Sequence, residues 1–357
     1  MKRRQWLRAT LGLGALAGLS GLSPAVKSLQ WERRSMLGFG TTLSLHAAHE
    51  DAGVLDRALD AGVQALRRIE SQMSLFQPDS ALCRLNRDGV LESPPDELVD
   101  ILDIAHAVSR DSDGAFDVTV QPLWLAFEQA RKAGRLPTTR EVNAARAKVD
   151  WRGLDATPRR IRFDTPGMAA TLNGIAQGYA ADHVRAVLAS RGIRHALVDA
   201  GEFAPLGRNS DALPWTLGIA DPREESALLT RLHADGRCVA TSADNLTSFS
   251  DDHRHHHIFD PHTGYSPPTL SSVTVVAESG AIADALTKVF FVAGPSQARV
   301  LAHRWKVDAL WVDKAGRWEA TAGFGLAQER GQGGSDQVRR EGARLGLGWD
   351  ARRKPQP

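Results

Sequence analysis

The hydrophobic positions of the chain recur every three to four residues in some segments and every second residue in others. The first period is typical of a helix with one buried face, and the second is typical of a half-buried strand. Helices are predicted at residues 52–74, 96–112, 138–149, 173–192 and 280–294, the fourth ending at Gly192. Strands are predicted at residues 38–48, 195–201, 215–221, 227–235, 238–242, 255–260, 271–277, 309–313 and 318–322.

The order of these elements indicates the fold class. Strands and helices are mixed, but they do not alternate as repeated βαβ units, which disfavours a doubly wound nucleotide-binding fold. The last two strands are separated by the short turn Lys314-Ala315-Gly316 and are expected to pair. We therefore predict an α+β body over residues 29–329. Residues 330–357 are rich in glycine and charge, and we expect them to form a loose tail.

The N-terminus has the pattern of an export signal. Arg3 and Arg4 precede a mildly apolar run of Ala, Gly and Leu, which ends near Ala25 after a serine and a proline. This pattern predicts a twin-arginine signal over residues 1–28 and therefore a periplasmic protein. An ordinary secretory signal or an uncleaved anchor is the alternative interpretation.

Composition excludes some classes of partner and site. The chain is 42% hydrophobic and 24% charged, and its net charge is +2. The basic residues are scattered among acidic ones, which argues against nucleic-acid binding. Cys83 and Cys238 are the two cysteines, so the chain has neither a disulfide framework nor a pair of closely spaced cysteines for zinc, and a single bridge stays open.

The segment 251–264, DDHRHHHIFDPHTG, holds five of the twelve histidines. On a strand, His255 and His257 share one face and His256 points to the other, so the three do not form one metal site. No cysteine or helical pair of histidines supports zinc. An exposed, histidine-rich hairpin is one interpretation, and His253, His255 and His256 are expected at the surface in either case.

A series of segments in chain order resembles the ApbE family of FAD:protein FMN transferases. Such an enzyme takes FAD, breaks its pyrophosphate, joins the FMN half through its phosphate to a threonine hydroxyl of an acceptor protein and releases AMP. The resemblance also implies a mixed α/β body with largely antiparallel sheets, packed helices and an active site in a cleft. The matching segments are 73–86 (MSLFQPDSALCRLN), 113–124 (DGAFDVTVQPLW), 172–184 (LNGIAQGYAADHV), 197–222, which includes LVDAGE and LPWTLGIADP, 240–242 (ATS), 256–264 (HHIFDPHTG) and 272–294.

The resemblance implies Mg²⁺-assisted phosphoryl transfer, with Asp284 as a metal ligand and catalytic residue. Asp284, Thr287 and Lys288 are spaced to lie on one side of the predicted helix. Family members commonly carry a threonine ligand where this chain has Lys288. Either Thr287 substitutes as a ligand, or the Lys288 ammonium takes part of the electrostatic role of the metal. A backbone carbonyl near Gly174 is the third expected contact.

The resemblance also implies the residues that bind FAD. His257 is expected to act as a general base or to orient phosphate. Phe76 is expected either to stack on a flavin or adenine ring or to pack in the core. Gln177 and Thr171 stand where relatives often have a lysine and an acidic residue. The expected FAD-binding residues are Phe76, Ala115, Phe116, Asp117, Thr171, Gln177, Glu202, Thr241, Ser242, His257 and Phe259.

Two other functions share the same pocket. The chain could be a periplasmic carrier that holds FAD without transferring it, or an FAD pyrophosphatase that gives FMN and AMP. As a transferase, its expected partner is an acceptor flavoprotein of an exported or membrane electron-transport system, such as the Rnf, sodium-pumping quinone reductase or nitrous-oxide-respiration systems. The chain would then meet the inner membrane only through its acceptor.

Overall fold

The computed structural model describes residues 28–224 and 226–327. The predicted signal at 1–28 and the predicted tail at 330–357 therefore lie almost wholly outside the described residues. None of the helices within the described ranges has both the length and the apolar character needed to cross a membrane.

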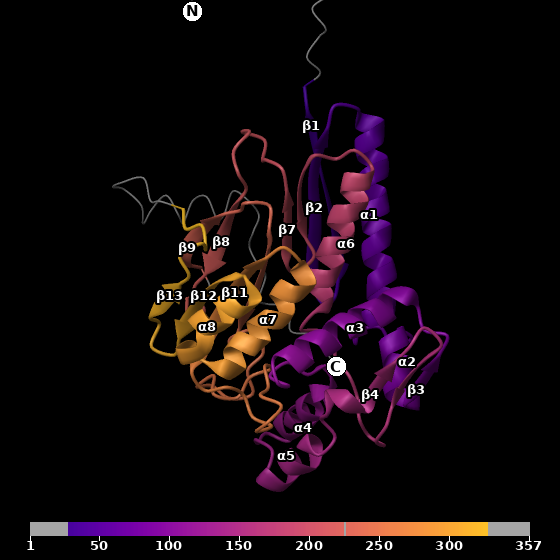
Figure 1. Cartoon of the computed structure of the whole chain (residues 1–357), viewed down its shortest axis with the longest axis vertical. Coiled ribbons are helices and arrows are strands. Elements are labelled where there is room, and N and C mark those ends of the chain that lie inside the picture. Colours follow the sequence, from indigo (N-terminus) through magenta and orange to yellow (C-terminus); the bar gives the residue numbers. More distant parts are fainter. Residues whose placement is uncertain (1–27, 225, 328–357) are drawn as a thin grey trace, which may run out of the picture.

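An eight-stranded antiparallel sheet forms the centre of the molecule (Figure 1). Each strand pairs with its neighbours in antiparallel register. The prediction of a mixed body with largely antiparallel sheets is confirmed. In spatial order the strands are β1 (Gln30–Gly38), β2 (Thr41–His49), β6 (His195–Asp199), β7 (Phe203–Leu206), β10 (Cys238–Ala243), β11 (Leu270–Ala277), β12 (Asp308–Asp313) and β13 (Trp318–Ala320).

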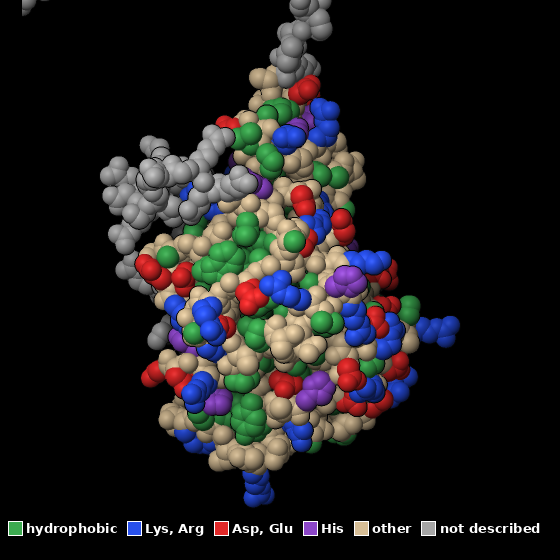
Figure 2. All heavy atoms as spheres, turned by 60° about the vertical axis from the view of Figure 1, so that its left-hand side comes forward, with side chains coloured by type: hydrophobic (Ala, Val, Ile, Leu, Met, Phe, Trp, Pro, Cys, Tyr) green, Lys and Arg blue, Asp and Glu red, His purple; other side chains and the backbone are tan. Residues whose placement is uncertain are grey.

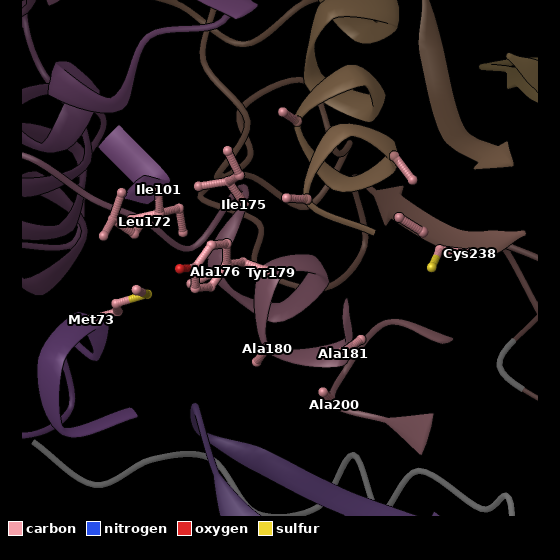
Figure 3. Close-up of a cluster of buried hydrophobic side chains, with 14 of the residues drawn as sticks. Met73, Ile101, Leu172, Ile175, Ala176, Tyr179, Ala180, Ala181, Ala200 and Cys238 are labelled. Carbon is pink, nitrogen blue, oxygen red and sulfur yellow. The ribbon is translucent and has the colours of Figure 1, made fainter. Parts of the chain in front are cut away.

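One layer of helices covers one face of this sheet and buries the main core. In Figure 1 the helices α1 and α6 run side by side, and α7 follows next to α6. Figure 3 shows part of this core at the start of α6, where Leu172, Ile175 and Tyr179 lie near Ile101 and Met73. The helices of this layer are α1 (Ala52–Met73), α3 (Asp96–Asp111), α6 (Ala176–Ser190), α7 (Gly280–Ala293) and α8 (Pro295–Trp305).

A two-stranded hairpin packs on the opposite face of the sheet. Its strands are β8 (Thr216–Ala220) and β9 (Leu228–His233). Val239, Val276 and Leu310 belong to this second core, whereas their immediate neighbours along the strands belong to the main one. Because side chains alternate across a strand, the central strands are buried on both sides.

A smaller region at the other end of the molecule carries the remaining elements. Phe127, Val142 and Leu123 from its helices form a separate cluster with Phe249 and Phe259. This cluster attaches the long connection between β10 and β11 to the small region. The elements are α2 (Ala81–Asp88), β3 (Val90–Glu92), the short helix η1 (Val118–Val120), α4 (Gln121–Lys132), α5 (Thr139–Arg146), the short helix η2 (Trp151–Gly153), β4 (Leu154–Ala156) and β5 (Arg160–Phe163).

The predicted strand at 255–260 is wrong. This segment makes only the isolated bridge between Ser248 and His256. Burial along the segment still alternates, with His256 buried and both of its neighbours partly exposed, so the three histidine side chains do not all face one side. Sequence patterning also missed α2, α4 and α8, as well as β1, β3, β4, β5 and β7.

Two further predictions from composition can be compared with the structure. Cys83 and Cys238 are both free, so the disulfide that the sequence left open is absent. On the face drawn in Figure 2, Lys and Arg side chains lie among Asp and Glu side chains rather than in one basic patch.

Candidate functional site

A close crossing of α6 and α7 positions the first candidate residue, Asp284. A Cβ atom added at Gly178 would lie 2.0 Å from the carbonyl oxygen of Gly280, so the two helices touch through their backbones. This approach allows the Gly178 N–H to donate to Asp284 Oδ2 at 3.2 Å. Asp182 strengthens the crossing because its Oδ2 accepts from Ser279 Oγ at 2.8 Å, at the start of α7. The position of Asp284 is therefore fixed by two helices.

Lys288 pairs with Asp284 one turn further along α7. Its Nζ lies 2.5 Å from Asp284 Oδ1 and 3.2 Å from the Asp284 carbonyl oxygen. The Asp284 side chain is 1% exposed and that of Lys288 is 18% exposed. Removing one partner of such a buried pair leaves an uncompensated charge, which makes the two residues a unit.

Thr287 faces the sheet. Its hydroxyl donates to the Asp284 carbonyl at 2.6 Å and lies 2.7 Å from Ser242 Oγ on β10. The Thr287 side chain is fully buried. The three residues of α7 are therefore neighbours, as their spacing predicts, but the threonine hydroxyl is already engaged between α7 and the sheet.

Glu202 adds a second buried carboxyl group near Asp284. Its Oε2 accepts from the Thr241 N–H at 2.9 Å. Burial and the nearby Asp284 carboxylate raise the pKa of Glu202 well above its usual range, although Lys288 acts in the opposite direction. The Thr241 hydroxyl pairs with Thr274 Oγ across β10 and β11 at 2.9 Å, so this side chain serves the sheet.

Gly174 lies beside the stem of Lys288 and beside the ring of Phe116. A Cβ atom at Gly174 would lie 3.1 Å from Lys288 Cε and 3.5 Å from a ring carbon of Phe116. Phe116 is 5% exposed, and the adjacent Ala115 is also buried. The structure thus brings together the segments around 113–120, 171–175 and 284–288, which sequence reasoning had assigned to one site.

Asp117 holds one of these segments in place. Its Oδ1 accepts from both the N–H and the hydroxyl of Thr119, and its Oδ2 accepts from the Trp151 N–H. Burial raises the pKa of Asp117 to about 6, against the lowering effect of these hydrogen bonds. Thr171 joins the same segment because its N–H donates to the Val118 carbonyl at 2.7 Å. Both residues stabilise the backbone around Phe116.

Gln177 lies over the turn that presents Glu202. A Cβ atom at Gly201 would lie 2.0 Å from Gln177 Nε2, and the Gly201 φ of +94° is one that other residues rarely adopt. Because Gly201 has no side chain, the Gln177 amide can pack directly against the turn.

His257 lies within reach of the charge of Lys288. Its Nδ1 is 3.3 Å from the Thr247 carbonyl oxygen, which can only accept, so Nδ1 carries the proton and Nε2 is left as an acceptor. Burial is the main cause that lowers the pKa of His257 to about 4, and the Lys288 charge adds to it. The imidazole is therefore neutral at physiological pH.

The structure corrects the predicted placement of two other histidines. His256 was expected at the surface but is fully buried, with its N–H donating to Ser266 Oγ at 2.8 Å and its ring 5.9 Å from that of Phe291. His255 is partly buried, 5.8 Å from the Phe127 ring. The ring of Phe291 on α7 gives His256 an apolar neighbour. Hydrophobic periodicity could not predict this contact, because His256 lies in an irregular segment.

The two aromatic candidates for flavin contact lie in different environments. Phe259 is 5% exposed, and its ring centroid lies 5.1 Å from that of Phe127, so the ring packs in the core of the small region, and its contact with the flavin stays a prediction. Phe76 is 58% exposed, and its ring rests against Gly40. Core packing of Phe76 is excluded, and flavin stacking stays a prediction.

The arrangement does not fit a divalent cation at Asp284. Mg²⁺ is bound by oxygen ligands in near-octahedral geometry. Asp284 Oδ1 is already paired with the Lys288 ammonium and Oδ2 with the Gly178 N–H, while the Thr287 hydroxyl is engaged with Ser242. Within residues 28–224 and 226–327, no group of three His, Cys, Asp or Glu side chains could hold a metal ion.

Sequence reasoning missed a buried ionic cluster that holds the histidine-rich segment. The fully buried Asp244 accepts from Arg223 Nη1 and Lys314 Nζ, each at 2.6 Å. Lys314 also donates to the His253 carbonyl at 3.0 Å. The sequence shows an aspartate just after a predicted strand, which could have indicated a buried charge. It does not reveal the partners Arg223 and Lys314, because they lie far from Asp244 in the chain.

A second missed residue is Asn86. Its side chain donates to the Ala170 carbonyl at 2.8 Å and accepts from the Ala170 N–H at 2.7 Å. This pair of bonds fixes the loop that leads to Gly174. The only signal in the sequence was the place of Asn86 at the end of the family-like segment 73–86, which did not identify its partner.

The chain is similar to known flavin transferases over most of its length. The model of the ApbE family matches residues 39–311. The FAD:protein FMN transferase of Salmonella typhimurium is 29% identical over 290 residues, which cover 74% of this chain and 83% of the relative. The enzyme of the same name from Vibrio cholerae is 29% identical over 324 residues, covering 87% of this chain and 94% of the relative.

Solved structures give the same result at the level of the fold. The ApbE protein of Thermotoga maritima has a TM-score of 0.73 and 28% identity, and the match covers 83% of this chain and 98% of the other. The flavinyl transferase ApbE of Pseudomonas stutzeri, in its apo form, has a TM-score of 0.70 and 28% identity, with coverages of 82% and 94%.

Proposed function

The chain belongs to the ApbE family, and from that premise we propose that it is an enzyme that transfers FMN from FAD to an acceptor protein. The observation that carries this proposal is the match to proteins named FAD:protein FMN transferase over 83% and 94% of their own lengths. In finer detail, the acceptor group is a threonine hydroxyl and the second product is AMP.

The reaction is a displacement at the phosphorus atom of the FMN half of FAD. The threonine oxygen forms a new P–O bond, the P–O bond to the AMP half breaks, and AMP leaves with the bridging oxygen. Such transfers need positioning and charge stabilisation more than covalent help from the protein. Neutral His257 offers Nε2 as an acceptor for the threonine proton or as a hydrogen-bond partner that orients phosphate.

We place the reaction in the periplasm. The twin-arginine pattern at Arg3 and Arg4 supports this location, and the partner would be an exported or membrane-bound electron-transport flavoprotein. Fusing residues 1–28 to a reporter that matures only before export tests the location. Loss of export after replacing both arginines with lysine is the expected result, and unchanged export would reject the twin-arginine route.

The transfer itself is tested with purified protein lacking residues 1–28, FAD and a peptide that carries a threonine acceptor. A peptide that becomes covalently fluorescent, together with AMP in equal amount, is the expected result. Free FMN with AMP would identify a pyrophosphatase, and intact bound FAD would identify a carrier. An acceptor peptide with alanine in place of threonine is the matched control.

A further inference from the structure

We propose that the Lys288 ammonium is the cation that binds the pyrophosphate of FAD in this chain, and that the chain uses it in place of a divalent metal at Asp284. This inference rests on FAD being the substrate. It also explains why a lysine stands where the family resemblance predicts an oxygen ligand.

The hydrogen bonds of Lys288 leave part of its ammonium group free for a ligand. An ammonium group has three protons to donate. Two acceptors lie near Nζ, and both belong to Asp284. Among the residues that the structure describes, no third acceptor is within hydrogen-bond distance, while 18% of the side chain remains exposed. A phosphate oxygen would complete the set.

The stem of Lys288 is held so that the ammonium has a defined position. Cε lies against Gly174, where even a Cβ atom would come within 3.1 Å, and the Phe116 ring adjoins the same glycine. Asp284, which orients Nζ, is itself fixed by the Gly178 N–H. A lysine held at both its stem and its head loses little further freedom when it binds an anion, which favours affinity.

The charge of the ammonium also influences other residues of the candidate site. Its charge acts on both Glu202 and His257, which come from different segments of the chain. The charge of the ammonium thus extends to the His257 imidazole, the group proposed to receive the proton of the attacking hydroxyl. Asp284 then serves as a positioning residue for Lys288.

A divalent cation would compete with this arrangement. To bind Asp284 Oδ1 it would have to displace the ammonium, and the two like charges would repel one another at that distance. Replacing Lys288 with threonine removes the competitor, frees Oδ1 and adds a hydroxyl oxygen on the same turn of α7. We therefore expect Lys288→Thr to create a metal requirement that the natural chain lacks.

The test compares the natural chain with Lys288→Met, Lys288→Thr and the control Lys132→Met, which removes an exposed lysine of α4. FAD affinity is measured from quenching of flavin fluorescence in EDTA and in Mg²⁺, and binding of Mn²⁺ is followed by electron paramagnetic resonance. Peptide flavinylation is measured under the same conditions, and thermal unfolding verifies that each variant is folded.

In EDTA, the natural chain should bind FAD and flavinylate the peptide within about twofold of its rate in Mg²⁺, whereas metal-dependent enzymes lose far more. Lys288→Met should weaken FAD binding about tenfold or more, the loss expected for one charge-assisted contact. Lys288→Thr should bind Mn²⁺ and recover affinity only with metal, and Lys132→Met should behave like the natural chain.

Two results would overturn the inference. One is a natural chain that binds Mn²⁺ and loses transfer in EDTA by more than about tenfold, as a metal-dependent enzyme would. The other is unchanged FAD affinity in folded Lys288→Met. If no variant flavinylates the peptide under any condition, the proposed function fails, while the FAD-binding comparison still decides the role of Lys288.

Discussion

At the scale of single residues, the most buried carboxylate of the candidate site, Asp284, is fully engaged by groups of the chain itself. Asp284 has an ammonium on one oxygen and a backbone N–H on the other. A carboxylate placed in this way contributes to folding, and under the proposed function it also positions the ammonium that would meet the substrate. Mutagenesis must therefore separate the loss of the ion pair from the loss of the positive charge that Asp284 holds in place.

Replacing Asp284 with asparagine should reduce both stability and flavin transfer. The substitution leaves the Lys288 ammonium without its partner in a buried place, which costs about 3–5 kcal/mol when one member of such a pair is lost. Transfer should fall by at least roughly hundredfold, since the charge at the phosphate moves. Urea unfolding and the flavinylation rate measure the two effects.

The double variant Asp284→Asn with Lys288→Met provides the control for this experiment. Removing both charges should restore much of the lost stability, because no unpaired charge remains, but it should not restore transfer. Recovery of transfer in the double variant would remove the Asp284–Lys288 pair from the chemistry and leave it a purely structural feature.

Replacing His257 with alanine should leave FAD affinity nearly unchanged and slow transfer by roughly 10²-fold, the usual scale of general acid–base help. In the natural chain, the rate should show no inflection near pH 6.5 from this histidine, because its pKa is lowered to about 4. The measurements are flavin quenching and the rate between about pH 5 and 8.

His303 is exposed on α8, and its replacement by alanine is the matched control. Equal losses of FAD affinity and rate in His257→Ala would identify a residue that positions the nucleotide, and an unchanged rate would place His257 outside the reaction.

At the scale of elements, the crossing of α6 and α7 is the feature that builds the site. Two glycines let the backbones touch, and this contact brings a donor from α6 to a carboxylate on α7. Helices usually pack with their axes 8–10 Å apart, separated by side chains. The site therefore depends on the absence of side chains at two positions far apart in the sequence.

Gly178→Ala should force the two helices apart, because its Cβ atom would lie 2.0 Å from the Gly280 carbonyl oxygen. We expect a loss of stability in the range of overpacked cores, about 1–3 kcal/mol, and slower transfer as the hydrogen bond to Asp284 breaks. Urea unfolding and the flavinylation rate measure both quantities.

Gly53→Ala in the first turn of α1 is the control, since its new Cβ atom would meet mainly the flexible end of Arg57. Its stability should stay close to that of the natural chain. If Gly178→Ala is equally harmless, the close crossing does not constrain the site.

At the scale of the whole molecule, the sequence predicted the longest helices and the grouping of the site, but not the contacts within it. The amphipathic helix at 52–74 and the buried strand at 271–277 have strong periods, and both are confirmed as α1 and β11. The pairing of Lys288 with Asp284 was not foreseen, although their spacing on one helix is compatible with it.

What the sequence could not supply depends on the tertiary fold. His256 lies in an irregular segment whose polarity suggests a surface, yet Phe291 and Ser266 bury it. Phe259 packs against Phe127 of α4, a helix that sequence patterning missed, so this neighbour was not foreseen. Neither environment is encoded in local periodicity, because each is created by an element from elsewhere in the chain.

The buried histidines predict how the stability of the molecule depends on pH. Burial lowers the pKa of His256 to about 3, from an ordinary value of 6.5. As the pH drops below about 6.5, this histidine binds a proton in the unfolded chain but not in the folded one. The free energy of unfolding therefore falls by up to ~1.4 kcal/mol per pH unit from this group. Asp117, with a pKa of about 6, opposes this trend between about pH 6 and 4.

His256→Gln isolates the contribution of that histidine, because Asp117 is common to both proteins. The free energy of unfolding of the variant should change less between pH 7 and pH 5 than that of the natural chain, by about 2 kcal/mol. Parallel curves from urea titrations at the two pH values would mean that His256 is protonated in the folded state.

The two free thiols make the natural chain suitable for site-specific fluorescent labelling without any engineering. Cys238 is fully buried against Asp182, and burial raises the pKa of its thiol, so a maleimide should not react with it. Cys83 is partly exposed, and its Sγ lies 3.8 Å from the Leu75 carbonyl, beside Phe76. One dye per molecule is expected at Cys83, where energy transfer to a bound isoalloxazine would report on the occupancy of the Phe76 region in real time.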